Sequence, residues 1–317
     1  MEAAIGIDFG GTTIKSGLVA GGNVLKRGTV VDTQKAGGLE DLLGALVGIV
    51  EELRGEGVAG VGVGLPGMVD ANRGVVNQLT NVAGWNSVPL REILEKRTGL
   101  PVAIENDANA MAYGEWRHGA AKDGRHVICI TLGTGVGGAL ILDGRLYRGA
   151  TMGAGEVGHM SIDYHGLQGH YGNHGALEKY VGNQQITDRA FSRYAKKGMG
   201  RIREQCTPAA LSEAARAGDE IALGLWEEVG YEIGVALSSA IWLVNPDTVV
   251  IGGGVAKAGE LVFGPIRRTI CSQTGRVFHE HLRIVEAQLG NDAGIIGNAA
   301  LALEAAADAA RNPVRSV

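Results

Sequence analysis

The chain pairs an apolar strand with a glycine-rich turn three times, and this pairing constrains its fold more than any other feature. Buried strands are predicted over residues 3–8, 126–132 and 249–251, and the glycine turns that follow them over 8–13, 133–138 and 252–254. Glycine has no Cβ, so the amides of such a turn can converge on an anion, and turns of this kind bind phosphate. One such turn is most often only a tight turn, so it is the repetition that predicts phosphate sites.

The composition indicates a globular protein rather than a fibrous or low-complexity one. Glycine makes up 52 of the 317 residues, but there are only 7 prolines, no Gly-X-Y period and 45% hydrophobic residues, enough for a sizeable core. The net charge of −5, without a long basic block, argues against a nucleic-acid partner. The longest apolar stretch, near residues 233–244, is too short to span a membrane. An N-terminus without a signal peptide's basic region and three widely spaced cysteines predict a reduced, cytoplasmic protein.

Strands alternate with helices along the chain, which predicts an α/β fold with largely parallel central strands. Helices are expected over residues 39–53, 90–97, 107–117, 209–244, 261–273 and 293–309. Both halves open with the same order of strand, glycine turn, strand, hairpin and strand. We therefore expect two α/β domains packed around a cleft, a small one formed by residues 1–118 and 299–317 and a large one formed by residues 119–298.

The fingerprints of other nucleotide-binding proteins are absent. There is no Gly-x4-Gly-Lys-Ser/Thr motif, and although residues 133–138 have the Gly-x-Gly-x-x-Gly spacing, a hairpin rather than a helix follows them. Thr12 and Thr134 add hydroxyl groups to two of the glycine turns. Asp8 is suited to hold Mg²⁺ against nucleotide phosphates, and Lys15 to neutralise their charge. The alternatives are a turn aspartate and a solvated lysine.

Asp107 lies where a predicted strand meets a predicted helix. An aspartate there often caps the helix. At the carboxyl end of a strand it can also act as a general base, because its carboxyl group is ionised at neutral pH. Glu156, His159 and Glu178 stand among glycines, where carboxylates can accept two adjacent hydroxyls of a sugar. Taken singly, each of these three also fits a structural or surface role.

Four histidines between residues 159 and 174 raise the question of a metal site. Their spacings of six, five and four residues match no common zinc pattern, and no cysteine lies nearby, so a site made of these histidines is disfavoured (His159, His165, His170 and His174).

Taken together, the motifs resemble those of the ROK sugar kinases, and bacterial glucokinases in particular. The resemblance runs from residue 5 to about residue 297, and the motifs are specific in this order, although each alone is weak. They read IDFGGTTIK at 7–15, GLPG at 64–67, ENDANA at 105–110, TLGTGVGG at 131–138, GEVGH at 155–159, LEKY at 177–180 and IGGG at 251–254.

The resemblance implies an actin-like (ribonuclease H-like) fold of two α/β domains that close on a cleft, with ATP and Mg²⁺ as the donor system and a hexose as the acceptor. Asp107 corresponds to the general base on the sugar's 6-hydroxyl, and Asp8 to the residue that serves Mg²⁺ while nucleotide is bound. The sugar ligands implied are Gly67, Asn106, Asp107, Glu156, His159 and Glu178. The nucleotide and phosphate ligands implied are Asp8, Gly10, Gly11, Thr12, Thr13, Lys15, Thr131, Gly133, Thr134, Gly135, Gly253 and Gly254.

The chain departs from the family at its zinc motif, Cys-x-Cys-Gly-Asn-x-Gly-Cys-Leu-Glu. The aligned residues 169–178 read GHYGNHGALE, so Gly169, Tyr171 and Ala176 replace the three cysteines. His159 is then the one remaining ligand, too few for a tetrahedral site. We therefore predict that the chain has no structural zinc.

The resemblance predicts ATP-dependent phosphorylation of the 6-hydroxyl of a hexose, with glucose as the expected substrate, in a homodimer or homotetramer. The alternatives are another hexose (an N-acetylhexosamine, mannose or fructose) or polyphosphate as the donor, since polyphosphate glucokinases also lack the cysteines. A non-catalytic sugar sensor is a further alternative, disfavoured because Asp107 and the glycine turns are kept. A repressor role is disfavoured too, because the first strand starts at residue 3, which leaves no room for a helix-turn-helix.

Overall fold

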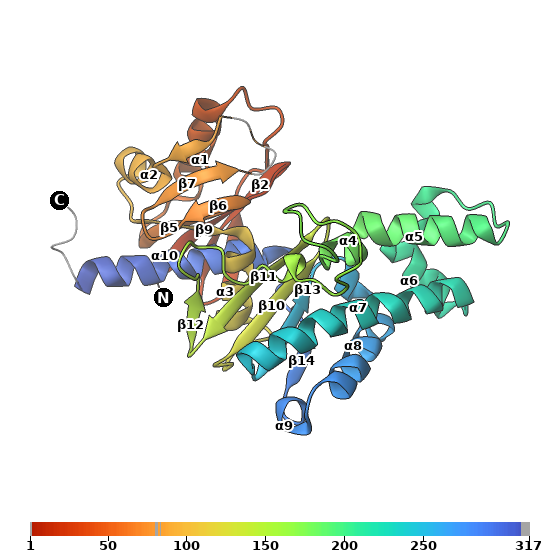
Figure 1. The fold of residues 1–317 in the computed structure, drawn as a ribbon. Coiled ribbons are helices and arrows are strands. Elements are labelled where there is room, and N and C mark those ends of the chain that lie inside the picture. The colour runs from red at the N-terminus through yellow and green to blue at the C-terminus, as the bar shows by residue number, and fades with distance from the viewer. Residues whose placement is uncertain (1, 80–81, 83, 312–317) are drawn as a thin grey trace. The chain divides into compact units, whose positions relative to one another are not determined.

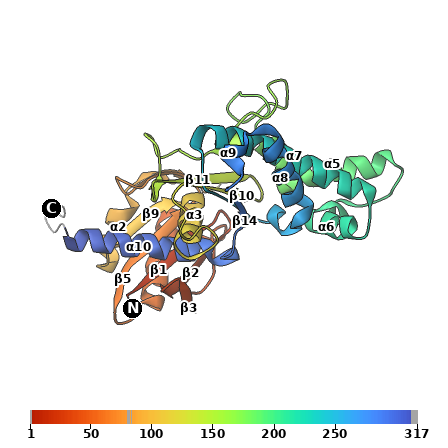
Figure 2. The same ribbon diagram turned by 90° about the horizontal axis from the view of Figure 1, so that it is seen from below.

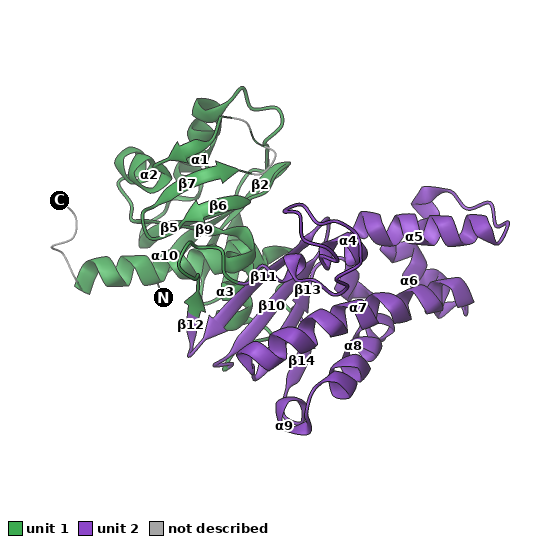
Figure 3. Cartoon of the chain, in the orientation of Figure 1, with its two compact units in different colours: residues 1–123, 146–154, 288–317 green, residues 124–145, 155–287 purple. Residues whose placement is uncertain are grey.

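The structure is a computed structural model that describes residues 2–79, 82 and 84–311. The chain forms two compact units, coloured separately in Figure 3. Unit 1 consists of Met1–Asp123, Leu146–Ala154 and Gln288–Val317, and unit 2 of Gly124–Arg145 and Gly155–Ala287. The domain boundaries predicted after residue 118 and before residue 299 stay a prediction.

Unit 1 is built on a sheet in the strand order β3-β2-β1-β5-β9, with β4 paired to β2. The pairing of β1 with β2 is antiparallel, whereas β1–β5 and β5–β9 are parallel. The strands are β1 (Ala3–Phe9), β2 (Thr13–Ala20), β3 (Asn23–Arg27), β4 (Val31–Asp32), β5 (Val58–Leu65) and β9 (Val102–Asn106). Strand β3 ends at Arg27, and residues 28–30 separate it from β4.

Helices cover both faces of this sheet. Helices α1 (Leu39–Leu53) and α2 (Leu90–Thr98) contribute Leu42, Leu46 and Leu94 to a core with Ile5 and Ile7 of β1. Helices α3 (Asp107–His118) and α10 (Ala293–Arg311) lie side by side in Figures 1 and 2 and pack on the other face. A Cβ on Gly62 of β5 would lie 1.8 Å from the carbonyl oxygen of Asn298, so only glycine lets α10 approach the sheet this closely.

A small antiparallel sheet follows β5, in the order β6 (Gly67–Asp70), β7 (Val75–Leu79) and β8 (Asn86–Val88). The GLPG motif at residues 64–67 gives no sign of these three strands. In the structure β5 continues to Leu65, and the short strands pack Val69 and Val76 into the core of unit 1.

Unit 2 contains a second sheet, in which β11, β10, β13 and β14 are neighbours in that order. Strand β10 (Val127–Leu132) is antiparallel to β11 (Val136–Leu142) and parallel to β13 (Thr248–Gly252), which is parallel to β14 (Arg283–Glu286). The boundary between the units falls within β12 (Arg145–Tyr147).

The helices of unit 2 are α4 (Glu178–Val181), α5 (Asn183–Lys196), α6 (Pro208–Arg216), α7 (Glu220–Val244), α8 (Glu260–Gln273) and α9 (Arg276–His279). Helices α7 and α8 lie side by side in Figure 1, and a Cβ on Gly234 would lie 2.5 Å from Thr269. The segment 209–244, expected to be mostly helical, forms α6 and α7, which are separated where Gly218 has a φ of +88° and Asp219 caps α7. Within the described part of the chain, no helix is both long and apolar enough to cross a membrane.

Candidate active site

The first glycine turn joins β1 to β2 in unit 1. The amide of Gly10 donates to the carbonyl of Thr13 at 2.9 Å, so this amide is used inside the turn. An anion at this turn would therefore meet the neighbouring amides and the hydroxyls of Thr12 and Thr13. The strand register sets Lys15 opposite Asp8, which brings a cation beside the carboxylate.

Asp8 is half-buried at the end of β1, against the first turn of α10. A Cβ on Gly294 would lie 2.9 Å from the Asp8 carboxyl carbon, so the helix start has no side chain between them. Burial raises the pKa of Asp8 above its ordinary value, and the charge of Lys15 opposes this rise. A desolvated carboxylate at a strand end is an oxygen ligand suited to Mg²⁺.

The strand-to-helix junction at the end of β9 carries the proposed base. Asn106, rather than Asp107, caps α3: its side-chain oxygen accepts from the amides of Ala108 at 2.9 Å and Asn109 at 3.2 Å. The reading of Asp107 as the cap is therefore wrong. The side-chain nitrogen of Asn106 donates to the carbonyl of Gly67 at 3.3 Å, which joins two of the predicted sugar residues in unit 1.

A buried ion pair supports this junction, and the sequence reasoning missed it. Glu105, 2% exposed, accepts through Oε1 from the amide of Asn106 and the side chain of Asn109, both at 3.0 Å. Its Oε2 pairs with Nε of Arg148 at 2.7 Å. A glutamate directly before Asn-Asp at a strand end was the available signal for Glu105, whereas nothing in the sequence singles out Arg148.

In unit 2, the second glycine turn follows β10. The amide of Gly133 donates to the carbonyl of Gly135 at 3.0 Å, and the carbonyl of Gly133 accepts from the amide of Asn183 at 2.8 Å. The first residue of α5 is therefore tied to the turn. Thr131 pairs with Gly252 in the parallel register of β10 and β13, which brings the second and third glycine turns to one sheet edge.

Gly253 brings the third turn close to the end of β10. It has a φ of +88°, and a Cβ there would lie 2.2 Å from the carbonyl oxygen of Leu132. No other residue type satisfies both requirements without displacing backbone.

The predicted sugar ligands of unit 2 lie together. His159 Nδ1 is 3.6 Å from Oε1 of Glu178, and its Nε2 is 3.8 Å from Oε2 of Glu156. Both His159 Nδ1 and Glu178 Oε1 are buried and have no hydrogen-bond partner among the residues that the structure describes. A Cβ on Gly135 would lie 3.5 Å from Oε2 of Glu178, so the phosphate turn adjoins this group.

The residues that replace the zinc cysteines lie in a loop beside these ligands. The amide of Gly169 donates to the carbonyl of Asn173 at 2.6 Å, Ala176 is buried, and the Tyr171 ring meets the edge of His159. In the described ranges, no group of three or more His, Cys, Asp or Glu residues could hold a metal ion. The absence of zinc stays a prediction, which rests on the three missing cysteines.

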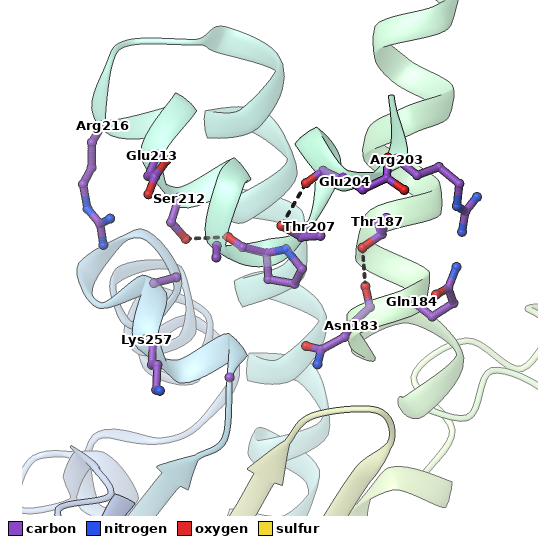
Figure 4. Close-up of a pocket in the computed structure, with 14 residues that line it drawn as sticks. Asn183, Gln184, Thr187, Arg203, Glu204, Thr207, Ser212, Glu213, Arg216 and Lys257 are labelled. Carbon is purple, nitrogen blue, oxygen red and sulfur yellow. Dashed lines mark hydrogen bonds between the residues drawn. The ribbon is translucent and has the colours of Figure 1, made fainter. Parts of the chain in front are cut away.

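A cavity of about 620 Å³ lies at the N-terminal end of α5, facing α6 and the end of β13 (Figure 4). Gly254 lines it, as do Asn183 of α5 and Lys257 after β13. Oδ1 of Asn183 is buried, and the described part of the chain offers it no hydrogen-bond partner. Of the lining residues, only Gly254 is among those predicted from the sequence. The other lining residues, which come from several segments, are Gln184, Thr187, Arg203, Glu204, Thr207, Pro208, Ala209, Ser212, Glu213, Arg216 and Ala258.

The chain was compared with known proteins. The model of the ROK family matches residues 4–305. The chain is 35% identical to a glucokinase of Thermotoga maritima, over 95% of this chain and 97% of that protein, and 36% identical to a glucokinase of Streptomyces coelicolor, over 96% and 98%. The crystal structure of a ROK family glucokinase from Streptomyces griseus, in complex with glucose and AMPPNP, matches with a TM-score of 0.77 at 36% identity, covering 95% of this chain and 99% of that one. With these similarities and a fold that matches this kinase, the chain belongs to the ROK family and has its actin-like α/β architecture.

Proposed function

We propose that this protein is an ATP-dependent hexose kinase that transfers the terminal phosphoryl group to the 6-hydroxyl of its sugar, with glucose as the preferred acceptor. One observation carries the proposal. Within unit 2, the Gly133–Gly135 turn contacts both Asn183, which lines the cavity, and Glu178, which neighbours His159. A phosphoryl donor held along this turn would point from a nucleotide pocket toward a sugar.

The cavity suits the nucleoside part of ATP. Its volume falls within the range of about 300–1,000 Å³ that small-molecule sites occupy. Oδ1 of Asn183 is an acceptor without a partner in the described chain, and a hydroxyl or amino group of the nucleoside would satisfy it. In Figure 4 the side chains of Arg216 and Lys257 lie on one side of this cavity and Arg203 on the other, and the carboxylates of Glu204 and Glu213 also line it.

The group around Glu178 suits a sugar. Two buried polar atoms without partners cost free energy, and each additional hydroxyl supplied by a ligand removes part of this cost. A carboxylate accepts two hydroxyl donors at once, and an imidazole nitrogen accepts or donates one more bond. Glu156, His159 and Glu178 in unit 2, with Asn106 and Gly67 in unit 1, are the residues that we assign to the sugar hydroxyls.

Asp107 would orient the 6-hydroxyl and accept its proton as the phosphoryl group is transferred. It begins α3 and its Oδ1 accepts from the amide of Ala108 at 2.8 Å, a bond that holds the carboxylate at a fixed place. General bases of this kind contribute roughly 10²–10⁴-fold to the rate. ATP with Mg²⁺ supplies the phosphoryl group and spreads its negative charge, and Asp8 is the residue suited to hold the cation.

The glycine turns and their hydroxyls would stabilise the negative charge of the donor, so catalysis depends mainly on position and electrostatics. The residues assigned to this task in unit 1 are Gly10, Gly11, Thr12, Thr13 and Lys15, and those in unit 2 are Thr131, Gly133, Thr134, Gly135, Gly253 and Gly254. We further propose a cytoplasmic homodimer or homotetramer, without structural zinc.

A coupled assay that crosses glucose, mannose, fructose and N-acetylglucosamine with ATP and polyphosphate tests the proposal. The expected result is Mg²⁺-dependent turnover with glucose and ATP. Asp107→Ala should lower kcat more than about 10²-fold while sugar binding by calorimetry survives. Asp308→Ala, an exposed aspartate of α10, is the matched control and should leave kcat unchanged. A near-normal kcat for Asp107→Ala would contradict the assignment of the base.

A further inference from the structure

The loop between His159 and Glu178 is held by its own hydrogen bonds. Two antiparallel bridges, Ser161↔Ala176 and Gln168↔His174, close it like a short hairpin. The hydroxyl of Tyr180 accepts from the amide of Leu167 at 2.8 Å, which ties the loop to α4. Its tip consists of residues 170–172, and at position 171 the zinc motif of the ROK family has a cysteine.

The tip returns to the two proposed sugar ligands that flank the loop. The ring of Tyr171 lies 5.0 Å from the ring of His159, centroid to centroid, at an interplanar angle of 80°. The side-chain amide of Asn173 donates to the His159 carbonyl at 2.8 Å. On the other side of the tip, Nε2 of His170 is 3.4 Å from Oε1 of Glu178 and 3.1 Å from Nζ of Lys179.

Tyr171 is unusual because it is 82% exposed and yet its ring contacts the half-buried side chain of His159. An exposed tyrosine gains little from burial, so its position must depend on the contact that it makes. An edge-to-face contact restricts the rotation of the imidazole, and His159 Nδ1, buried and without a partner in the described chain, needs a fixed direction to meet a hydroxyl.

We propose that Tyr171 is a positioning residue for sugar binding. It fixes the His159 ring by edge contact, in a loop that lacks the cysteines of the family's zinc motif. His170 supports it by anchoring the tip at Lys179, whose ammonium group donates to Nε2 of His170. The inference rests on the proposed function, because it assigns His159 to the sugar. It also explains how a sugar site can stay organised without a metal: the aromatic ring at position 171 restrains the same histidine.

The test compares steady-state kinetics of Tyr171→Ala, Tyr171→Phe and Tyr164→Ala. Tyr171→Ala removes the contact between the two rings, and the energy of such an aromatic pair corresponds to a rise in the KM for glucose of about threefold to tenfold. The kcat, the KM for ATP and the melting temperature should stay as in the wild type, because the ring is exposed. Tyr171→Phe keeps the ring and should restore the KM.

Tyr164 is the matched control because it is equally exposed in the same loop, at 80%, but its ring packs on His165 instead of a sugar ligand. Its alanine variant should leave the KM for glucose unchanged. An unchanged KM in Tyr171→Ala, or an equal rise in Tyr164→Ala, would overturn the inference while the kinase assignment stands. A wild type without sugar phosphorylation would overturn both. Finding one zinc per chain, whose removal raises the KM, would show that a metal holds the loop and would also overturn the inference.

Discussion

Arg148 is the cation that pairs with the Glu105 carboxylate in the described structure, and removing its charge tests how the base is held. We consider Arg148→Met, which keeps much of the side-chain volume and removes the charge. Glu105 would keep its two bonds to Asn106 and Asn109 but would lie 2% exposed without a counter-charge. Breaking a buried pair from one side costs about 3–5 kcal/mol.

The lower end of that range applies here. The Arg148 side chain is 28% exposed, so water reaches the site once the guanidinium is gone. We therefore expect the free energy of unfolding of unit 1 to fall by about 3 kcal/mol. For a body of this size each kcal/mol shifts the melting temperature by about 2–4 °C, so the calorimetric transition should move down by about 6–12 °C.

A second variant separates the buried charge from the lost contact. Glu105→Gln in the Arg148→Met background removes the uncompensated charge, while the amide oxygen can still accept from Asn106 and Asn109. Much of the lost stability should return, as it does when both partners of a buried pair are replaced. Arg145→Met, at an exposed arginine, is the control and should change stability by less than about 0.5 kcal/mol. If the double variant is less stable than Arg148→Met, the reasoning is refuted.

Two further substitutions test the glycine turns. Burial raises the pKa of Asp8, so ionisation of its carboxyl group destabilises the folded state. The protonated group contributes its full stability to the fold below the ordinary carboxyl pKa of about 4, and this stability is lost as the pH rises through the folded-state pKa. Asp8→Asn should therefore have a higher melting temperature than the wild type at pH 7, and this difference should disappear as the pH approaches 4. The variant should have no activity. A difference in melting temperature that grows on acidification would contradict the raised pKa of Asp8. Gly253→Ala should cost at least about 2 kcal/mol more than Gly259→Ala in urea unfolding, since both have positive φ but only Gly253 has backbone within 2.2 Å of the new Cβ. Equal losses would show that strain in φ alone decides the effect.

Local signals in the sequence predicted well where the strands end and where α3 begins. The strands before the glycine turns and the start of α3 at Asp107 lie where the apolar runs and turn residues placed them, because both signals are short-range. Helix α5 was missed because it begins at Asn183 without a side-chain cap. The strands β6 to β8, of three to five residues, are too short for an alternating pattern to be read.

The candidate site shows why some residues could not be predicted. Asp8 lies near the end of β1 and Asp107 directly follows β9, so a rule about strand ends finds them. The cavity is lined by residues from α5, α6 and the segment after β13, which are separate in sequence and meet only through packing. The pairing of Glu105 with Arg148 is of the same kind, since 43 residues separate the partners. Side-chain direction also lies beyond sequence patterns, as the cap at Asn106 instead of Asp107 shows.

The polar atoms without partners explain how this site could combine affinity with selectivity. Among the described residues, His159 Nδ1 and Glu178 Oε1 are buried without a hydrogen-bond partner and lie 3.6 Å apart. Each such atom costs about 1–3 kcal/mol while it is unsatisfied. A hexose with hydroxyls at the right places removes this cost on binding, whereas a sugar that lacks one of them leaves it in place. Because the cost is set by the protein and not by the ligand's size, discrimination against a missing hydroxyl is stronger than any pocket could achieve by shape alone. Restraint of the His159 ring by Tyr171 would then affect selectivity as well as affinity. An imidazole free to rotate could follow a displaced hydroxyl, and the site would lose its selectivity between sugars.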